Sequence, residues 1–310
     1  MKLYQPQQRI AKQVLLELTE WPRKLAPAER SYLDGVCAWP IERVDDGPKP
    51  VGVTMKRLPD RFFRHLSTGV SRPLELQYLL RPRSCVRLGI EVPSDEQRLT
   101  ICTRYAEFLS FLHAHERIYG DVSATNWLWA AAPTPEIFVI DCDATRKRGG
   151  VPAVPVGGTP EWMDPTVPSS AQDVHSDRLL LSIAIIRILT GDPRRVYDPS
   201  LQQFGPPLTP EIVDLVRRAA VGSRGDRPPA GDYVQALTRA LTSPGPASVR
   251  RRDTIQLHPK GASTGTTQAP RTRGSITLGG GRPKPAQPLA AGLWLPLMIL
   301  LAWLASRAAA

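Results

Sequence analysis

The chain has 310 residues, of which 42% are hydrophobic, enough for one large core or two small ones. Its four cysteines are scattered without a C-x-x-C pair, which argues against a disulfide framework or a zinc site and favours a reducing compartment (Cys37, Cys85, Cys102, Cys142). The net charge is +11, but residues 244–287 alone hold eight Lys or Arg against one acid. Because most of the excess positive charge lies in this one segment, the net charge is poor evidence for a globular face that binds nucleic acid.

The N-terminal segment predicts a short strand followed by a helix, and its first residues show no secretory signal. Lys2-Leu3-Tyr4 is typical of the end of a strand. Pro6 is placed to open a helix that runs to about Glu20, because apolar residues recur at helical spacing up to that point and Pro22 then stops them. Glu17 is the one acid on the apolar stripe of this helix.

The next segments predict a strand pair and then a long helix. Residues 36–44 and 51–55 are rich in β-formers and enclose a turn at 45–50. A helix is expected around residues 73–80. Ser94 with a Gln three residues later forms a capping box, and the apolar stripe after it predicts a helix to about residue 115 that faces the core.

An acidic pattern follows that helix. Asp121 and Asn126 lie five residues apart on a predicted loop, and the apolar run Ile137–Ile140 ends at Asp141. Phosphoryl transfer uses such a set: one carboxylate orients the attacking hydroxyl, while the Asn and a second carboxylate hold Mg²⁺ against the nucleotide phosphates. In isolation the Asp-x4-Asn pair also fits residues that cap helices and form turns.

The pattern resembles the catalytic half of a bacterial eukaryotic-like Ser/Thr protein kinase, of the type whose loop reads Gly-Asp and whose metal motif reads Asp-x-Asp. The resemblance implies that Asp121 is the catalytic aspartate, that Asn126 is catalytic and binds metal, and that Asp141 binds Mg²⁺. It implies ATP and Mg²⁺ as cofactors. Gly120 stands where many kinases carry an Arg that meets a phosphate, so switching by phosphorylation at that site is not expected.

The resemblance also implies contacts with the nucleotide. Lys2 would pair with the phosphates, with Glu17 as its partner and Glu20 as the alternative, while Met55 and Arg57 would belong to the hinge that meets adenine. In the alternative interpretation, Lys2 is a charged terminal residue and Glu17 a helix-surface acid. The family's Gly-rich hairpin would stand before Lys2, where this sequence has one residue. A truncated lobe, a misplaced start and a chain that dispenses with the hairpin remain open.

Gly157–Pro165 resembles the kinase GTPEYMAPE segment that seats a peptide substrate. This match implies a protein substrate and argues against a small-molecule phosphotransferase. The last Glu of the motif is Thr166 here, and its usual ion-pair partner resembles Arg227. The structural ion pair is therefore expected only if Glu161 or Asp164 substitutes.

Three more helices are predicted towards the C-terminal side. Ser176 is placed as an N-cap for an almost wholly apolar helix over residues 177–190. Asp177 resembles the kinase aspartate that braces the backbone of the catalytic loop, although it also fits a capping acid. Thr209 precedes a helix that begins with a proline, and residues 230–241 predict the last one.

The remaining sequence changes character. Residues 244–287 predict a disordered basic linker rich in Pro and Gly, without the aromatic residues that a single-strand binding platform needs. Residues 288–306 carry no charge, and Trp294 and Trp303 lie near their ends, which predicts a transmembrane helix. An amphipathic or docking helix is the alternative. The charge bias predicts a single-pass protein of the cell membrane with its kinase domain in the cytoplasm.

The expected fold class is α+β: a protein-kinase-like two-lobed fold with a reduced N-lobe sheet (1–58), a mainly helical C-lobe (59–243) and a C-terminal transmembrane helix. The expected function is that of a membrane-anchored protein kinase that transfers the ATP γ-phosphate to Ser or Thr of proteins. The alternatives are a pseudokinase that serves as a binding module and a small-molecule phosphotransferase. The expected partners are a protein substrate and the membrane, not nucleic acid. The sequence shows no phosphatase partner.

Overall fold

The computed structural model describes residues 1–155, 157–159 and 161–242, in which helices alternate with small sheets. The helices are α1 (Lys12–Glu20), α2 (Pro27–Val36), α3 (Leu76–Leu79), α4 (Pro82–Leu88), α5 (Asp95–Ala114), α6 (Val174–Thr190), α7 (Pro210–Val221) and α8 (Ala230–Thr242). The strands are β1 (Lys2–Leu3), β2 (Pro40–Asp46), β3 (Lys49–Met55), β4 (Phe63–His65), β5 (Ser71–Pro73), β6 (Arg117–Ile118), β7 (Trp127–Ala130), β8 (Glu136–Val139) and β9 (Arg146–Lys147).

The N-terminal strand is held at the edge of an antiparallel three-stranded sheet in the order β1-β3-β2. Lys2 lies opposite Val53, and Leu3 lies opposite Gly52. A Cβ atom at Gly52 would stand 2.3 Å from the carbonyl oxygen of Lys2, so only glycine allows the two strands to come this close. The predicted pair of strands is confirmed as β2 and β3, which are antiparallel neighbours. Strand β2 starts later than expected, because the residues up to Val36 belong to the end of helix α2.

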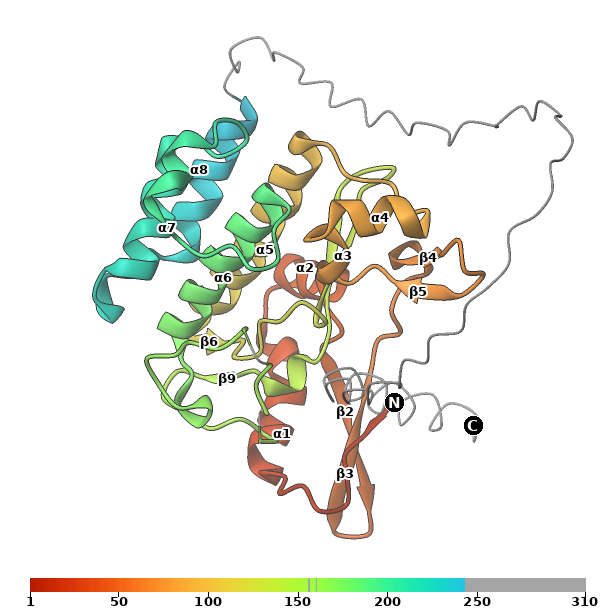
Figure 1. The fold of residues 1–310 in the computed structure, drawn as a ribbon. Coiled ribbons are helices and arrows are strands. Elements are labelled where there is room, and N and C mark those ends of the chain that lie inside the picture. The colour runs from red at the N-terminus through yellow and green to blue at the C-terminus, as the bar shows by residue number, and fades with distance from the viewer. Residues whose placement is uncertain (156, 160, 243–310) are drawn as a thin grey trace, which may run out of the picture. The chain divides into compact units, whose positions relative to one another are not determined.

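Four helices form the larger layer. Figure 1 shows α5, α6, α7 and α8 side by side, and α5 packs against both α6 and α8. Helix α5 starts at the predicted capping box, in which Ser94 Oγ accepts from the backbone of Gln97 at 3.2 Å and Gln97 Oε1 accepts from the backbone of Ser94 at 2.9 Å. The main hydrophobic cluster joins these helices to residues of α1 and α2, such as Leu18 and Leu33.

Two helix starts differ from the prediction. Helix α1 begins at Lys12 rather than Pro6, because the preceding residues form a turn and the backbone N–H of Ala11 donates to Ala153 at 2.8 Å. Helix α6 is capped by Asp173 rather than Ser176, since the Asp173 carboxylate accepts from the first-turn amides of His175 and Ser176 at 2.8 and 3.1 Å. Aspartate accepts two such bonds and outcompetes a hydroxyl three residues later.

The expected fold class is wrong as stated. The described residues are mixed α/β: strands are not confined to an N-terminal lobe but continue as separate two-stranded pairs, β4–β5, β6–β9 and β7–β8, between the helices. No helix in the described part of the chain is both long and apolar enough to cross a bilayer. The longest, α5, carries several charged side chains, and α6 is shorter. The predicted membrane helix at 288–306 and the linker at 244–287 lie outside the described residues, and the predicted boundary at residue 58 stays a prediction.

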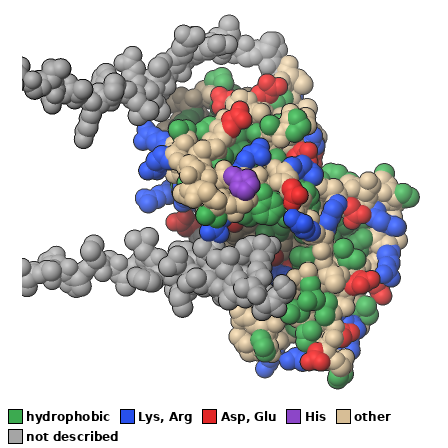
Figure 2. Space-filling view, turned by 90° about the vertical axis from the view of Figure 1, so that its right-hand side faces the viewer, with side chains coloured by type: hydrophobic (Ala, Val, Ile, Leu, Met, Phe, Trp, Pro, Cys, Tyr) green, Lys and Arg blue, Asp and Glu red, His purple; other side chains and the backbone are tan. Residues whose placement is uncertain are grey.

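Charges are nearly balanced over the described part of the chain. Residues 1–242 carry 31 Lys or Arg against 28 Asp or Glu. Figure 2 shows basic and acidic side chains interspersed over one face, with hydrophobic side chains between them. This arrangement is typical of an ordinary soluble surface, so any binding surface has to be identified from local clusters of unpaired charge rather than from the total.

Candidate functional site

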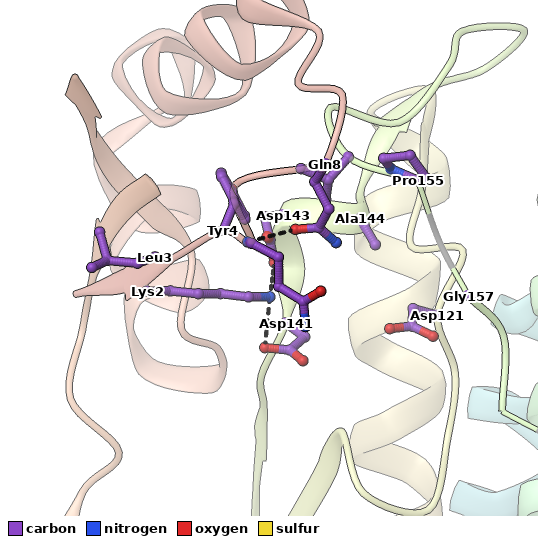
Figure 3. A pocket seen from close by; sticks show the side chains of 12 residues that line it. Lys2, Leu3, Tyr4, Gln8, Asp121, Asp141, Asp143, Ala144, Pro155 and Gly157 are labelled. Carbon is purple, nitrogen blue, oxygen red and sulfur yellow. Dashed lines mark hydrogen bonds and ion pairs between the residues drawn. The ribbon is translucent and has the colours of Figure 1, made fainter. Parts of the chain in front are cut away.

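A pocket of about 290 Å³ brings together residues that are far apart in the sequence. Lys2 reaches it from β1, Asp121 from the loop after β6, and Asp141 and Asp143 from the turn after β8. Figure 3 shows Asp121 across the pocket from the other three, with Pro155 and Gly157 along its rim. The sequence-predicted residues Lys2, Asp121 and Asp141 therefore converge on one cavity.

Lys2 is tied to both carboxylates beyond β8. Its Nζ lies 3.1 Å from Asp141 Oδ1 and 2.8 Å from Asp143 Oδ1. Burial lowers the pKa of Lys2, but the charges of Asp143 and Asp141 outweigh it, and the pKa is raised. Lys2 therefore stays charged, and its ammonium neutralises two acids that would otherwise repel each other.

Asp121 and Asn126 form a second polar pair on the opposite side. The Asn126 Nδ2 atom donates to Asp121 Oδ2 at 2.7 Å and to the Asp121 carbonyl at 3.1 Å. Burial and the nearby charge of Asp141 raise the pKa of Asp121 to about 7, although the bond from Asn126 and the charge of Lys2 act the other way. A carboxylate with this pKa exchanges a proton readily near neutral pH, as a general base must.

The residues around Asp141 fit a divalent cation in part. No cluster of three or more His, Cys, Asp or Glu arranged to hold a metal occurs in the described residues. However, Asp141 lines the pocket with a side chain that is 42% exposed, and the buried Oδ2 of Asp143 has no hydrogen-bond partner within the part of the chain that the structure describes. Carboxylate oxygens are the ligands that Mg²⁺ prefers. Asp141 also has φ of +56°, a left-handed conformation that non-glycine residues rarely adopt and that recurs at functional sites.

The loop that carries Asp121 is fixed from below by helix α6. Asp177 accepts from the backbone N–H of Tyr119 at 2.8 Å and of Gly120 at 2.9 Å, and its Oδ2 lies 3.1 Å from His113 Nε2. The predicted bracing role of Asp177 is confirmed. Because Asp177 is fully buried, these bonds hold the loop backbone rigidly beneath the pocket.

Gly120 leaves room for an arginine from another strand. Its φ is +75°, and a Cβ atom there would stand 2.3 Å from Nη1 of Arg146 on β9. The buried Arg146 side chain also donates to the carbonyls of Ala144, at 3.3 Å, and of Gln172. A guanidinium group therefore does lie beneath the catalytic-type loop, supplied by a later strand instead of by the residue before Asp121.

Asp164 forms the buried ion pair that the sequence left open. It pairs with Arg227 and Arg224, and it accepts from Thr166 Oγ1 at 2.6 Å and Ser176 Oγ at 3.2 Å. Of the two acids that the sequence left as candidates for this pair, Glu161 and Asp164, the structure therefore has Asp164. Burial alone would raise the pKa of Asp164, but the bonds from Arg227 and Thr166 outweigh it and hold the pKa well below its usual range.

The predicted pairing of Lys2 with Glu17 is wrong. Glu17 binds the guanidinium of Arg117, with Nη1 at 3.0 Å from Oε2, and Lys147 Nζ lies 3.5 Å away. Arg117 is only 2% exposed, so it needs a buried counter-charge, and α1 presents Glu17 to it. Glu20, the alternative partner, is exposed and also does not line the pocket.

The predicted hinge residues are not among those that line the pocket. Met55 ends β3 opposite Pro40 and packs between two small hydrophobic clusters. Arg57 is 86% exposed and pairs with Asp60 at 3.1 Å. Neither lines the cavity, so their predicted contact with a nucleotide gains no support.

The sequence analysis missed three residues of the site. Asp143 is the closest partner of Lys2, and the Asp-x-Asp spacing was its signal. Tyr4 lines the pocket from the end of the predicted N-terminal strand, and Gln8 lines it from the segment that was expected to be helical. Burial and the charge of Asp143 raise the pKa of Tyr4, so its hydroxyl stays neutral and is available as a hydrogen-bond donor.

Comparison with protein-family models and with curated proteins finds no match for this chain.

Proposed function

We propose that this pocket transfers a phosphoryl group from ATP to a hydroxyl group of a protein substrate. The observation that carries the proposal is the meeting of Lys2, Asp121, Asp141 and Asp143 in one cavity from positions up to 141 residues apart. A cation, a carboxylate with a pKa near neutrality and two further carboxylates are the groups that this reaction requires.

Each residue has a distinct task in this proposal. Asp121 accepts the proton of the substrate hydroxyl. The hydroxyl oxygen bonds to the γ-phosphorus of ATP, and the bond between that phosphorus and the bridging oxygen breaks, so that ADP leaves. Asn126 orients the Asp121 carboxylate through its amide. Lys2 offers positive charge to phosphate oxygens, and Asp141 and Asp143 would hold Mg²⁺. When bound, Mg²⁺ supplies charge that neutralises the phosphates.

The segment before α6 supports a protein as the acceptor. Gly157 lines the pocket, and Asp164 anchors the following residues to Arg227, so the segment that resembles a peptide seat begins at the cavity and is fixed beyond it. A peptide laid along this segment would present a hydroxyl near Asp121. The same resemblance argues against a small-molecule acceptor.

Two observations favour a second candidate, a binding module without catalysis. Lys2 is already paired with both carboxylates, and about 290 Å³ is at the lower limit of ligand pockets, which span about 300–1,000 Å³. In this reading the ion pairs stabilise a fixed surface and no nucleotide enters.

The deciding experiment measures nucleotide binding and transfer on the full chain. Calorimetry with ATP and Mg²⁺ is combined with transfer of label from γ-labelled ATP to protein or to small hydroxyl compounds. We expect binding, label on protein, and a loss of transfer of at least about 100-fold in Asp121→Asn with binding retained. Asp214→Asn, which alters an exposed ion pair on α7, is the matched control. Absence of nucleotide binding would overturn the proposal and favour the binding module, and binding without transfer to either acceptor would overturn the proposed transfer.

A further inference from the structure

A surface rich in arginine lies outside the pocket, on the β4–β5 hairpin and helix α4. We call it the arginine surface and define it by Arg64, Arg72, Val70, Arg81, Arg83, Val86 and Arg87. Ser67, in the hairpin turn, joins the two elements: its Oγ donates to the Arg87 carbonyl at 3.0 Å and its N–H donates to the Leu88 carbonyl at 2.9 Å. The hairpin and the helix therefore present one continuous surface.

The arginines of this surface form no ion pairs with the described residues, although the charge of Arg72 counteracts the rise that burial causes in the pKa of Glu75. Arg57 and Arg61, just before it, pair with Asp60 and Glu136 at 3.1 and 2.7 Å. None of the five arginines of the arginine surface forms an ion pair with a described residue, and the three from α4 and its N-cap are exposed.

Two of the arginines are placed directly against each other. Arg64 lies opposite Arg72 in the β4–β5 ladder, so both side chains are on the same face of the hairpin. Like charges at this separation destabilise a strand pair. An anion that binds both would remove the repulsion.

Exposed aliphatic side chains accompany the charges. Val70 is 46% exposed in the hairpin turn, and Val86 is 67% exposed on α4 between Arg83 and Arg87. Arginine with exposed valine is suited to a lipid surface, because the guanidinium groups meet headgroup phosphates while the aliphatic groups enter the boundary with the acyl chains. Phe63, the aromatic residue of the hairpin, is half-buried, so no exposed aromatic platform for single-stranded nucleic acid accompanies these arginines.

We propose that the arginine surface docks onto a membrane surface that contains anionic lipid. This contact is independent of the pocket and of the proposed phosphoryl transfer. It orients the β4–β5 hairpin and α4 towards the headgroups.

The test places a probe on the surface itself, because the basic residues 244–287 would also draw the full chain to anionic vesicles. The native cysteines are all buried, so Val70→Cys and Val86→Cys can each be labelled with an environment-sensitive dye in the full chain. Val221→Cys, at the end of α7 where the native side chain is 68% exposed, is the control position. Vesicles of phosphatidylcholine, with and without phosphatidylglycerol, are titrated into each protein.

We expect a blue shift at positions 70 and 86 with anionic vesicles only, reversed by high salt, and no shift at 221. Arg83→Glu with Arg87→Glu, in the Val70→Cys background, should weaken the response at least about tenfold. Arg23→Glu with Lys24→Glu makes the same charge change at two exposed residues elsewhere, and it should leave the fluorescence response at position 70 unchanged. Thermal unfolding verifies that each variant is folded. No shift at 70 and 86, or an equal shift at 221, would overturn the proposal. A shift with duplex DNA but not with vesicles would assign the surface to nucleic acid instead.

Discussion

Asp121 differs from its two neighbouring carboxylates because no cation of the described residues lies within ion-pair distance of it. Lys2 binds Asp141 and Asp143 directly, whereas the Asp121 side chain accepts from the amide of Asn126. Burial and the charge of Asp141 therefore raise its pKa to about 7, and the more distant Lys2 lowers it only in part. A carboxylate in this state is protonated about half the time at neutral pH, which suits a group that accepts and returns a proton.

Replacing Lys2 should move this titration. In Lys2→Gln the positive charge that lowers the pKa of Asp121 is gone, so the pKa should rise above 7, by roughly 0.5 to 1 unit for a charge that is not in direct contact. Carboxyl-carbon NMR titration measures it, with Asp121→Asn to assign the signal. An unchanged or lower pKa in Lys2→Gln would show that Lys2 does not act on Asp121.

Gly120→Ala tests the space that the loop leaves for Arg146. The substitution places a Cβ 2.3 Å from the guanidinium and also strains a backbone with φ of +75°. Gly149→Ala has the same strain, with φ of +74°, but nothing lies within 4 Å of its Cβ. Gly149→Ala should cost about 1 kcal/mol of unfolding free energy and Gly120→Ala distinctly more, about 2–3 kcal/mol. Urea denaturation measures both, and equal costs would mean that Arg146 does not press on the loop.

Two buried aspartates connect the loops of the site to the helices. Asp177 ties the catalytic-type loop to α6, and Asp164 ties the segment after the pocket to the residues that precede α8. Each carboxylate satisfies several donors at once, so each loop is held by one side chain on a rigid helical layer. Such anchoring is what keeps a reactive group within the small tolerance that catalysis needs.

Asp164→Asn should be severely destabilising. It leaves the buried guanidinium of Arg227 without its counter-charge, which costs about 3–5 kcal/mol, whereas the half-buried Arg224 keeps its second partner, Asp173. Asp214→Asn, which breaks only the exposed pair with Arg217, should cost less than about 0.5 kcal/mol. Thermal and urea unfolding compare the two, and a loss below about 1 kcal/mol in Asp164→Asn would remove the anchoring role.

The sequence predicted many of the local features around the site, but it predicted fewer of the ion-pair partners of individual side chains. The capping box of α5 and Asp177 beneath the loop follow from local patterns and from the family resemblance, and the structure has them. For the acid that pairs with Arg227 the sequence left two candidates, Glu161 and Asp164, and the structure selects Asp164. The pairing of Lys2 was predicted wrongly. Whether Lys2 meets Glu17 or Asp143 depends on where α1 begins and on the need of the buried Arg117 for a counter-charge, and the local sequence determines neither. The fold class failed for the same reason: the arrangement of short strands is decided by long-range contacts.

Over the whole molecule, the titrating carboxylates change the folding stability with pH in opposite directions. Asp164 and Glu17 have lowered pKa values in the folded chain, so their contribution to stability is present above about pH 4 and is lost as the pH falls below it. Asp121 has a raised pKa, so the folded chain holds its proton more tightly than the unfolded chain does. Its contribution is therefore present below about pH 4 and is lost as the pH rises from there towards 7.

Together these groups predict greatest stability near pH 4–5, with a decline on both sides. In Asp121→Asn the decline between about pH 4 and 7 should be weaker, so this variant should gain stability relative to the native sequence as the pH rises. Melting temperatures measured from pH 3 to 8 for both proteins check this. A parallel pair of curves between pH 4 and 7 would show that Asp121 does not titrate abnormally.

The contacts of Lys2 with Asp141 and Asp143 join positions 139 and 141 residues apart. During synthesis on a ribosome, Lys2 emerges before both of its partners, which follow only after a further 139 and 141 residues have been added. The pocket therefore cannot assemble on a short nascent chain, and the N-terminal strand must wait without its electrostatic partners. A completed pocket is thus a marker of a late stage of maturation, and premature termination before residue 141 would yield a product in which the lysine has neither acid to bind.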